Sequence, residues 1–235
     1  MDLGTILGVW AHPDDDAFLS SGVMADAVRK GLRVVCVTAT RGELGSWDEE
    51  RWPSETMGEV RVAELEESLA ILGVAEHHWL DYPDGGCAEV PVEEAAGRLA
   101  AIVEEAQPDS VLTFGPEGMT GHPDHEAVSA WATEGFRRAA GSGARLFYAT
   151  KTPEYVERLA PMLGGPEVFS AGTPPATPRE ELGIDFVLPE DLLDLKMEAL
   201  AAHRSQMEGL LTVFGPELFR EDAAAEWFVL AEMKL

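Results

Sequence analysis

The sequence predicts an α/β fold: a mostly parallel, twisted β-sheet with helices on both faces, built as a single domain over residues 1–235. Three observations support this prediction. Short apolar runs alternate with longer segments whose apolar residues recur at helical spacing. Strands separated by helices form βαβ units, which build parallel sheets. The chain is also long enough for one domain with a sizeable core.

Apolar runs along the chain predict the strands. The first five are expected at residues 5–10, 33–40, 77–82, 110–115 and 145–150, and two later ones at 184–189 and 226–231. Runs of this length that are bounded by Gly, Pro and Asp are more typical of strands than of helices.

Segments with helical periodicity lie between these runs. We expect helices at residues 17–31, 59–72, 91–106 and 124–140, and one from residue 190 to about His203 or a little beyond. Gly31 and Gly73 mark helix ends, and Pro91 stands near a helix start. The stretch 164–178 is rich in Pro, Gly and Thr, and it is predicted to be a loop within the same domain.

The charge balance limits the partners. The 43 acidic and 17 basic residues give a net charge of −26, which disfavours nucleic acid and anionic membranes because both need basic surface. We interpret the excess of acidic residues as a solvated acidic surface, with adaptation to high salt as the alternative.

Cys36 is expected in the core and Cys87 in a loop, and nothing indicates a disulfide. A signal-peptide pattern and a long apolar run are both lacking, so the prediction is a cytoplasmic protein without a membrane span.

Polar residues gather in the loops that follow the predicted strands. In an open parallel sheet, ligands bind outside the carboxyl ends of the strands, so these loops are the candidate site. The motif "HPDDD" (12–16) follows the first strand, and "HPDH" (122–125) follows the fourth. Pro13 and Pro123 each fix φ near −65° and restrict the preceding histidine, so each histidine is held extended where the chain turns into a helix.

The two motifs can aim at one point. His12 with Asp15, and His122 with His125, each place a second polar side chain on the first turn of the following helix. Two imidazoles and a carboxylate suit a divalent metal, and zinc in particular. A neighbouring aspartate such as Asp14 can then take a proton from water. Helix capping explains either motif alone, but capping does not require histidine in both.

Other polar residues give weaker signals. Arg61 with Glu64 at i+3 has the spacing of an ordinary helical ion pair, and Asp84 in "PDGG" is typical of a turn. Arg41 and Glu43 fit either a surface ion pair or a site role. Glycine-rich phosphate-binding motifs are lacking, which disfavours a nucleotide.

The paired motifs make the family recognisable. "AHPDDD" and "GHPDH" resemble the two signatures of the PIG-L / LmbE-like family of zinc-dependent N-deacetylases. The segments "TRGELG", "RVAELEESLAILGV", "LDYPDGG" and "KMEALAAHRSQ" also resemble family segments in the right order, so the resemblance covers roughly residues 5–206. It implies a Rossmann-like sheet.

The resemblance also implies roles for the residues of the first motif. One Zn²⁺ per chain, or another first-row divalent metal, would be bound by His12, Asp15 and His125, and Asp14 would be the general base. Asp16 departs from the pattern, because the family usually has Glu there; the residue is expected behind the metal ligands rather than among them.

Four further roles follow from the same resemblance. His122 would stabilise the oxyanion or protonate the leaving amine, and Asp124 would orient His122 or otherwise support the site. Arg61 and Asp84 match positions that contact sugar hydroxyls in family members that act on N-acetylglucosamine units.

The implied function is removal of the N-acetyl group from an N-acetylglucosamine-type amino sugar or its glycoconjugate, with release of acetate. One alternative is an amidase that acts on a larger thiol-conjugate or an acylated glycopeptide. Another is a non-catalytic sugar- or metal-binding protein on the same scaffold. The expected partner is a small molecule, and a homo-oligomer is possible.

Overall fold

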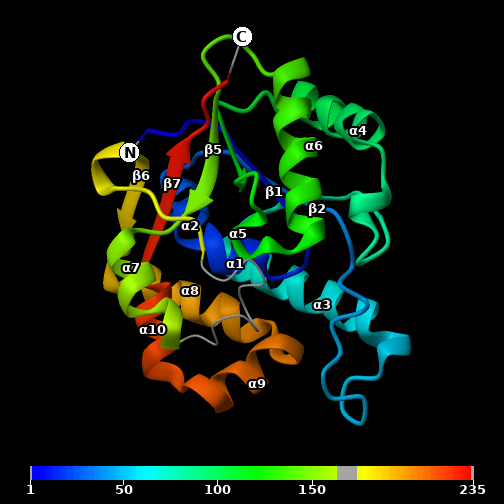
Figure 1. Ribbon diagram of the computed structural model, residues 1–235, viewed down its shortest axis with the longest axis vertical. Helices are drawn as coiled ribbons and strands as arrows, with labels where there is room; N and C mark the ends of the chain where they lie inside the picture. Colours follow the sequence, from blue (N-terminus) through cyan, green and yellow to red (C-terminus); the bar gives the residue numbers. More distant parts are fainter. Residues whose placement is uncertain (1, 163–173, 234–235) are drawn as a thin grey trace.

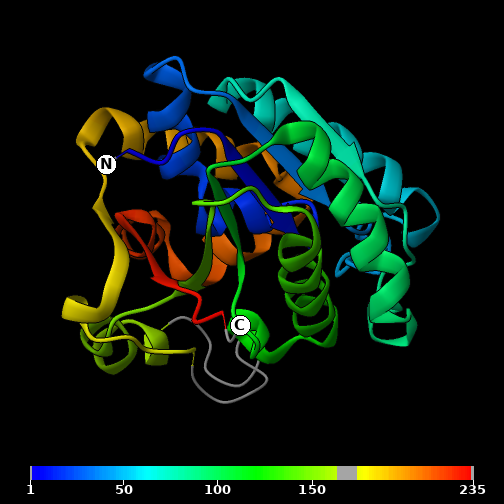
Figure 2. The same ribbon diagram turned by 90° about the horizontal axis from the view of Figure 1, so that it is seen from above.

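The computed structural model describes residues 2–162 and 174–233 (Figures 1 and 2). One sheet of seven strands runs through it in the order β3-β2-β1-β4-β5-β7-β6. The strands are β1 (Ile6–Trp10), β2 (Val34–Thr38), β3 (Glu76–Trp79), β4 (Ser110–Phe114), β5 (Arg145–Thr150), β6 (Leu182–Val187) and β7 (Ala225–Leu230). Every predicted strand is therefore present, with ends shifted by a few residues at most.

The predicted helices are also present, with changes at three of them. The helices are α1 (Asp15–Leu19), α2 (Ser21–Arg29), α3 (Ser54–Leu72), α4 (Val92–Ala106), α5 (Gly118–Gly121), α6 (Pro123–Ala139), α7 (Pro153–Arg158), α8 (Glu190–Ala202), α9 (Arg204–Phe214) and α10 (Pro216–Ala223). The helix predicted at 17–31 is two helices, α3 starts five residues before its predicted start at 59, and the helix predicted from 190 divides at His203. The predicted loop 164–178 lies outside the described residues up to position 173.

The strand pairing confirms the mostly parallel sheet. Strands β3, β2, β1, β4 and β5 are parallel, whereas β7 pairs antiparallel with both β5 and β6. The chain moves from β1 outward to β3 on one side, and from β4 outward to β5 on the other. Right-handed crossovers then put the helices of the two halves on opposite faces. Accordingly, α2, α3 and α8 pack together, and α4 packs on α6 (Figure 1).

The core lies between the sheet and these two helical layers. Strands β1, β2 and β4 are buried along their whole length, and the ring of Trp10 packs edge-on against Phe114 at 5.1 Å between centroids. Cys36 is buried in β2, as predicted. Cys87 is also buried, because it opens a short 3-10 turn beneath the loop, and neither cysteine forms a disulfide. Within residues 2–162 and 174–233, no helix combines the length and the apolar character that a membrane crossing requires.

Candidate active site

The site lies where the strand order reverses. Strands β1 and β4 are neighbours, yet the helices that follow them cover opposite faces of the sheet. Such a switch point leaves a crevice at the carboxyl ends of the two strands. The segment after β1 carries His12, and the segment after β4 carries His122, so the two predicted motifs meet at this crevice.

The turn after β1 holds a strained backbone. Asp14, between the end of β1 and the start of α1, has φ 125° and ψ −28°, a conformation that non-glycine residues rarely adopt. Strain of this kind costs about 1–3 kcal/mol and persists where the surroundings over-determine it. Arg61 from α3 supplies part of that support, because its Nη2 donates to the carbonyl oxygen of Pro13 at 2.5 Å.

The segment after β4 brings its histidines to the same point by a glycine turn. Gly118 has φ +67°, and a Cβ there would lie 2.9 Å from the Cβ of His125, so the close approach requires glycine. The carbonyl oxygen of Gly118 accepts a hydrogen bond from Nδ1 of His125 at 2.9 Å. The His125 ring also stacks on Phe114, with 4.1 Å between centroids. These contacts fix the orientation of the ring.

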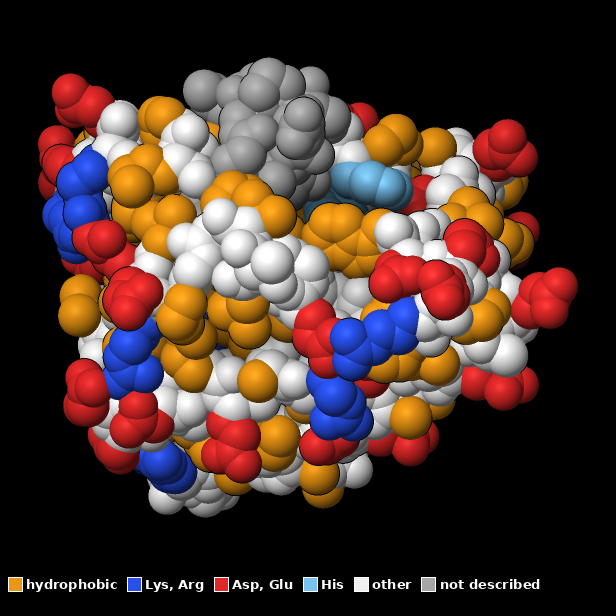
Figure 3. Space-filling model, turned by 90° about the horizontal axis from the view of Figure 1, so that it is seen from below, with side chains coloured by type: hydrophobic (Ala, Val, Ile, Leu, Met, Phe, Trp, Pro, Cys, Tyr) orange, Lys and Arg blue, Asp and Glu red, His pale blue; other side chains and the backbone are white. Residues whose placement is uncertain are grey.

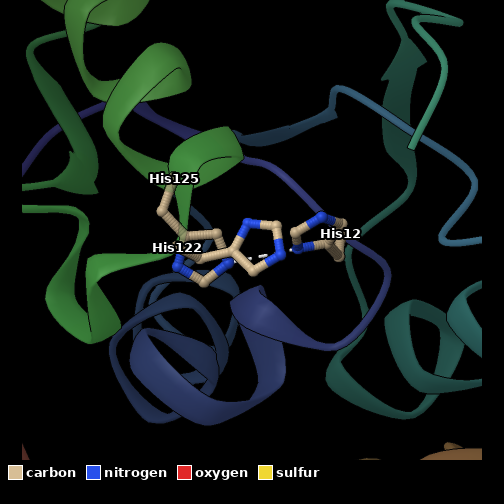
Figure 4. A group of neighbouring side chains, drawn as sticks. All are labelled: His12, His122 and His125. Carbon is tan, nitrogen blue, oxygen red and sulfur yellow. Dashed lines mark hydrogen bonds between the residues drawn. The ribbon is translucent and has the colours of Figure 1, made fainter. Parts of the chain in front are cut away.

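The three predicted metal ligands lie together, and Figure 4 shows two of them, His12 and His125, beside His122. Nδ1 of His12 is 3.1 Å from Nε2 of His125. The carboxylate of Asp15 completes the group, with Oδ1 at 3.4 Å from His125 Nε2 and Oδ2 at 3.7 Å from His12 Nδ1. Oδ2 of Asp15 also accepts from the backbone N–H groups of Ala11 and His12, which fixes the carboxylate.

In His12 and His125, the ring nitrogen that points away from the site has hydrogen-bond partners, and these partners determine which nitrogen faces the site. Nε2 of His12 is 3.1 Å from Oδ1 of Asp84 and 3.3 Å from Oδ2 of Asp124, so this nitrogen carries the proton and donates. Nδ1 of His125 donates to Gly118. The two inner nitrogens therefore face each other beside the Asp15 carboxylate, where a metal ion could replace the proton that they share. Two imidazoles and a carboxylate with outer hydrogen bonds form a donor set that a divalent metal could use.

The electrostatics favour a cation at that point. Burial alone would lower the pKa of His12, but its hydrogen bonds to Asp124 and Asp84 raise it to about 10. Burial lowers the pKa of His125 to about 4. One proton between the facing nitrogens satisfies both rings, and a divalent metal would satisfy them together with Asp15. The residues present thus fit a metal ion.

Asp14 faces the cavity beside these groups. Its Oδ2 is 3.1 Å from Nη2 of Arg61. Burial raises the pKa of the Asp14 carboxyl to about 7, although the Arg61 charge opposes the shift. A carboxyl group that titrates near neutral pH is suited to general-base chemistry.

His122 and Asp124 share the second motif but have different partners. Nδ1 of His122 accepts from the backbone N–H of Asp124 at 3.1 Å, which leaves Nε2 of His122 free for the cavity. The carboxylate of Asp124 does not contact His122. It accepts from the backbone N–H groups of Gly85 at 2.7 Å and Cys87 at 3.1 Å, and it faces His12.

Arg61 and Glu64 do not form the helical ion pair that their spacing suggested. Arg61 is buried in α3 and bonds to Pro13, Asp14 and the carbonyl oxygen of Gly42. Glu64 points instead at the start of α9, where it accepts from the N–H and the hydroxyl of Ser205. The ordinary ion-pair interpretation was therefore wrong for this pair.

Asp84 combines its turn position with site contacts. Besides its contact with His12, its Oδ2 accepts from the backbone N–H of Leu44 at 2.9 Å. Hydrogen bonding to His12 outweighs the effect of burial and lowers the pKa of Asp84 to about 2. Arg41, by contrast, forms an exposed ion pair with Asp81 and does not line the cavity.

Asp16 lies behind the ligands and away from the cavity. Its carboxyl group is fully buried, and neither oxygen has a hydrogen-bond partner among the described residues. Burial and the neighbouring carboxylates raise the pKa of Asp16 to about 7.

A cavity of about 520 Å³ extends from the two motifs. It contains all the predicted site residues except Asp124, together with a set that the sequence did not single out for the site. These further lining residues include Phe18, Leu19, Met119, Lys151, Tyr155, Gln206, Leu210, Phe214, Phe219 and Asp222. The i, i+4 and i+8 spacing of residues 206, 210 and 214 indicates one face of a helix, but it does not indicate whether that face lines a cavity or a core.

Comparison with known proteins agrees with this geometry. Residues 7–136 match the PIG-L family, described as GlcNAc-PI de-N-acetylase. A 1D-myo-inositol 2-acetamido-2-deoxy-alpha-D-glucopyranoside deacetylase of Saccharomonospora viridis is 31% identical over 260 residues, which cover 96% of this chain and 94% of the relative. A protein of the same name from Mycobacterium sp. (strain KMS) is 37% identical over 155 residues; that match covers 57% of this chain and only 50% of the relative's length.

A solved structure supports the fold. The N,N'-diacetylchitobiose deacetylase of Pyrococcus horikoshii superposes with a TM-score of 0.69 at 24% identity, over 98% of this chain and 84% of that one. On the family match and the relative aligned over nearly its whole length, this chain belongs to the PIG-L family.

Proposed function

We propose that this protein is a metal-dependent hydrolase that removes the N-acetyl group from an N-acetylglucosamine-type amino sugar or its glycoconjugate, releasing acetate and the free amine. The observation that carries the proposal is the convergence of His12 Nδ1, His125 Nε2 and the Asp15 carboxylate beside Asp14. The names of the relatives, which are deacetylases of acetamido sugars, support the same chemistry.

His12, Asp15 and His125 would hold the metal, and we propose Zn²⁺ because two imidazoles and one carboxylate suit it. When bound, such an ion supplies Lewis acidity toward the amide carbonyl and lowers the pKa of water. Asp84 and Asp124 accept the proton of Nε2 of His12, which orients the ring so that Nδ1 would be the nitrogen that binds the metal.

Asp14 would accept the proton of the attacking water, since its pKa near 7 leaves an ionised fraction at neutral pH. His122 would donate to the oxyanion or to the leaving amine through Nε2, because Nδ1 is held by the N–H of Asp124. Asp124 is then a positioning residue: its backbone orients His122 and its carboxylate orients His12.

Arg61 and Asp84 would contact the sugar hydroxyls, as both line the cavity on the same side of the metal ligands. Asp84→Ala should lower kcat/KM on an N-acetylglucosamine substrate by about 10- to 100-fold, the loss typical of a charged hydrogen bond. If kcat/KM of this variant equals that of the wild type, Asp84 does not contact the sugar.

The test is acetate release from a panel of N-acetyl sugars by zinc-loaded protein, followed by chelation and repletion. We expect about one divalent ion per chain, loss of activity on chelation, and recovery with zinc. The panel includes bulkier amides, thiol conjugates and acylated glycopeptides, so preference for those identifies the amidase alternative. Full activity in metal-stripped protein would contradict the hydrolytic mechanism, and metal binding without hydrolysis of any amide would favour the non-catalytic alternative.

We also propose that residues 1–235 act as one deacetylase domain, since strands from both ends of the chain pair in one sheet. The cytoplasm is the proposed compartment, because Cys36 and Cys87 are both free thiols.

A further inference from the structure

The cavity has two unlike sides. Strands β1 and β4 precede the metal-ligand group, with β2 and β3 on one side of them and β5 and β7 on the other. The side next to β2 and β3 carries the polar residues Arg61, Asp84 and Gln206, with Leu44 as its large apolar residue. The other side, which we call the apolar arm, is lined by Phe18, Leu19, Met119, Leu210, Phe214 and Phe219.

Helix α9 connects the two sides. Gln206, Leu210 and Phe214 are spaced at i, i+4 and i+8, so one face of the helix lines the cavity from its polar side to the apolar arm. The polar end is fixed, because the Gln206 side chain donates to the carbonyl oxygen of Gly45. At the other end the ring of Phe214 lies 6.1 Å from that of Phe219 on α10.

Four apolar residues of the arm, Phe18, Leu19, Leu210 and Phe214, are only partly buried, whereas Met119 and Phe219 are buried at its wall. Contiguous apolar surface of this kind marks a ligand-binding groove more often than a free surface. On the face of the molecule seen in Figure 3, hydrophobic side chains border the hollow in which histidine is visible. A bare amino sugar presents hydroxyl groups in every direction, so it would satisfy the polar side and leave the apolar arm in contact with water.

The floor of the apolar arm is polar but electrically neutral. Nζ of Lys151 lies 3.6 Å from Oδ1 of Asp222 and 4.3 Å from the centroid of the Tyr155 ring. The hydroxyl of Tyr155 donates to the same Asp222 oxygen at 2.5 Å. Because the lysine and the aspartate offset each other, the floor attracts neither an anionic nor a cationic tail.

We propose that the apolar arm receives an uncharged apolar group attached to the amino sugar, so that the preferred substrate is amphipathic. This inference rests on the proposed hydrolysis of an amide on an amino sugar, and an acyl chain in the arm would extend that function from deacetylation to deacylation. The apolar group can be a hydrophobic aglycone on the anomeric oxygen or an acyl chain longer than acetyl on the nitrogen, and the two share the chemistry that the arm recognises.

The experiment compares matched substrates on the zinc-loaded full chain. One pair is methyl and hexyl N-acetylglucosaminide, and the other is N-acetyl- and N-hexanoyl-glucosamine. Each methylene that leaves water strengthens binding by up to about fourfold. We expect kcat/KM to rise at least about 10-fold within one of the two pairs, which also identifies the position of the apolar group. Ratios within threefold in both pairs would overturn the inference while leaving the deacetylase function intact.

A binding measurement separates this inference from the proposed function. Hexyl and methyl glucosaminide lack the amide, and calorimetric titration of the zinc-loaded protein compares their affinities without turnover. Tighter binding of the hexyl compound by about 10-fold or more supports an aglycone in the arm even if no amide is hydrolysed. If kcat/KM instead rises between N-acetyl- and N-hexanoyl-glucosamine, we expect the hexyl and methyl glucosaminides to bind equally. Equal binding then supports an acyl chain, rather than an aglycone, in the arm.

Two variants place the effect in the arm. Phe214→Ala and Leu210→Ala should each reduce the hexyl-to-methyl or hexanoyl-to-acetyl ratio. The matched control is Val213→Ala, since Val213 is next to Phe214 on α9, is 73% exposed and does not line the cavity. A wild-type preference that survives in both arm variants, or that is lost equally in the Val213 variant, would contradict the assignment to the arm.

Discussion

Two buried groups of charges in this protein differ in how completely they are satisfied. In the first, Lys196 of α8 donates to Oε1 of Glu226 at 2.7 Å and to the carbonyl oxygen of Phe18 at 2.8 Å. The two oxygens of Glu226 also accept from the N–H groups of Gly22 and Val23 at the start of α2. Each charge has its partners, and the group ties α8, β7 and α2 together.

The second group is the active site, where negative charge is in excess. Five aspartates surround the site, at positions 14, 15, 16, 84 and 124, and Arg61 is the nearby cationic side chain that bonds to one of them. The inner nitrogens of His12 and His125 face each other at 3.1 Å. The contrast supports the proposed roles of the two groups: paired buried charges hold the fold, whereas crowded carboxylates around one point suit a cation.

The two groups are physically connected. The carbonyl oxygen that Lys196 binds belongs to Phe18 in α1, the helix that begins at the ligand Asp15. The structural pair therefore helps to fix the short helix on which a metal ligand stands.

Breaking the structural pair should cost the most stability. Glu226→Gln leaves the Lys196 ammonium buried without its counter-charge, so we expect a loss of about 3–5 kcal/mol in the free energy of unfolding. Urea denaturation measures it. The control is Asp191→Asn, which removes an exposed ion pair with Arg29 and should change stability by about 0–1 kcal/mol. A loss below 1 kcal/mol in Glu226→Gln would mean that the pair does not hold the fold.

Arg61→Ala should damage both activity and stability. The guanidinium supports the strained turn through Pro13 and offsets the charge of Asp14, so its removal affects more than a hydroxyl contact. We expect kcat/KM to fall by about 10- to 100-fold, the range for lost hydrogen bonds to a charged group, and the melting temperature to fall as well. Arg61→Lys keeps the positive charge but loses the planar guanidinium with its several N–H donors. It should therefore recover only part of the lost activity and part of the lost melting temperature. Activity at the wild-type level in Arg61→Ala would remove Arg61 from the site.

Asp124→Asn should weaken metal binding without removing a ligand. The amide cannot replace both the charge facing His12 and the acceptors for Gly85 and Cys87, so we expect a loss of about 10- to 100-fold in metal affinity or activity. Competition with a zinc chelator measures the affinity. Unchanged affinity and unchanged turnover together would contradict its positioning role.

Arg41→Ala should have the smallest effect. The residue forms an exposed pair with Asp81 and packs over the Trp79 ring at 4.9 Å. We expect a loss of about 0–1 kcal/mol in the free energy of unfolding and no change in kcat/KM. A loss of kcat/KM like that of Arg61→Ala would show that the loop after β2 contributes to catalysis through Arg41 as well.

The sequence predicted what depends on short spacings. Every strand, the mostly parallel sheet and the meeting of the two His-Pro-Asp motifs followed from local patterns, because strand ends of one parallel sheet share an edge. Contacts between distant segments were not accessible in this way. The helix predicted at 17–31 divides after Ser20 because Glu226, about 200 residues later, caps the start of α2. Likewise Glu64 caps the start of α9 at Ser205, which divides the predicted helix near His203 and releases Arg61 for the site.

The apolar arm was missed for a related reason. The sequence from 207 to 223 resembled no family segment, and Leu210, Phe214 and Phe219 have the spacing of ordinary core residues. The break at Gly215, with φ +78°, turns α10 back so that Phe219 faces the cavity. A cavity between helices has the same apolar pattern as a core, so sequence alone does not distinguish them.

We propose that the adjacent aspartates of one turn have different roles, with Asp15 a metal ligand and Asp14 the base. The most direct test is metal content and turnover of purified Asp14→Asn and Asp15→Ala, measured side by side after zinc loading. We expect Asp14→Asn to keep about one zinc per chain and to lose about 10²–10⁴-fold in rate. Asp15→Ala should lose the metal itself. If Asp14→Asn loses the zinc while Asp15→Ala retains it, the two roles are reversed and the account of the site is wrong.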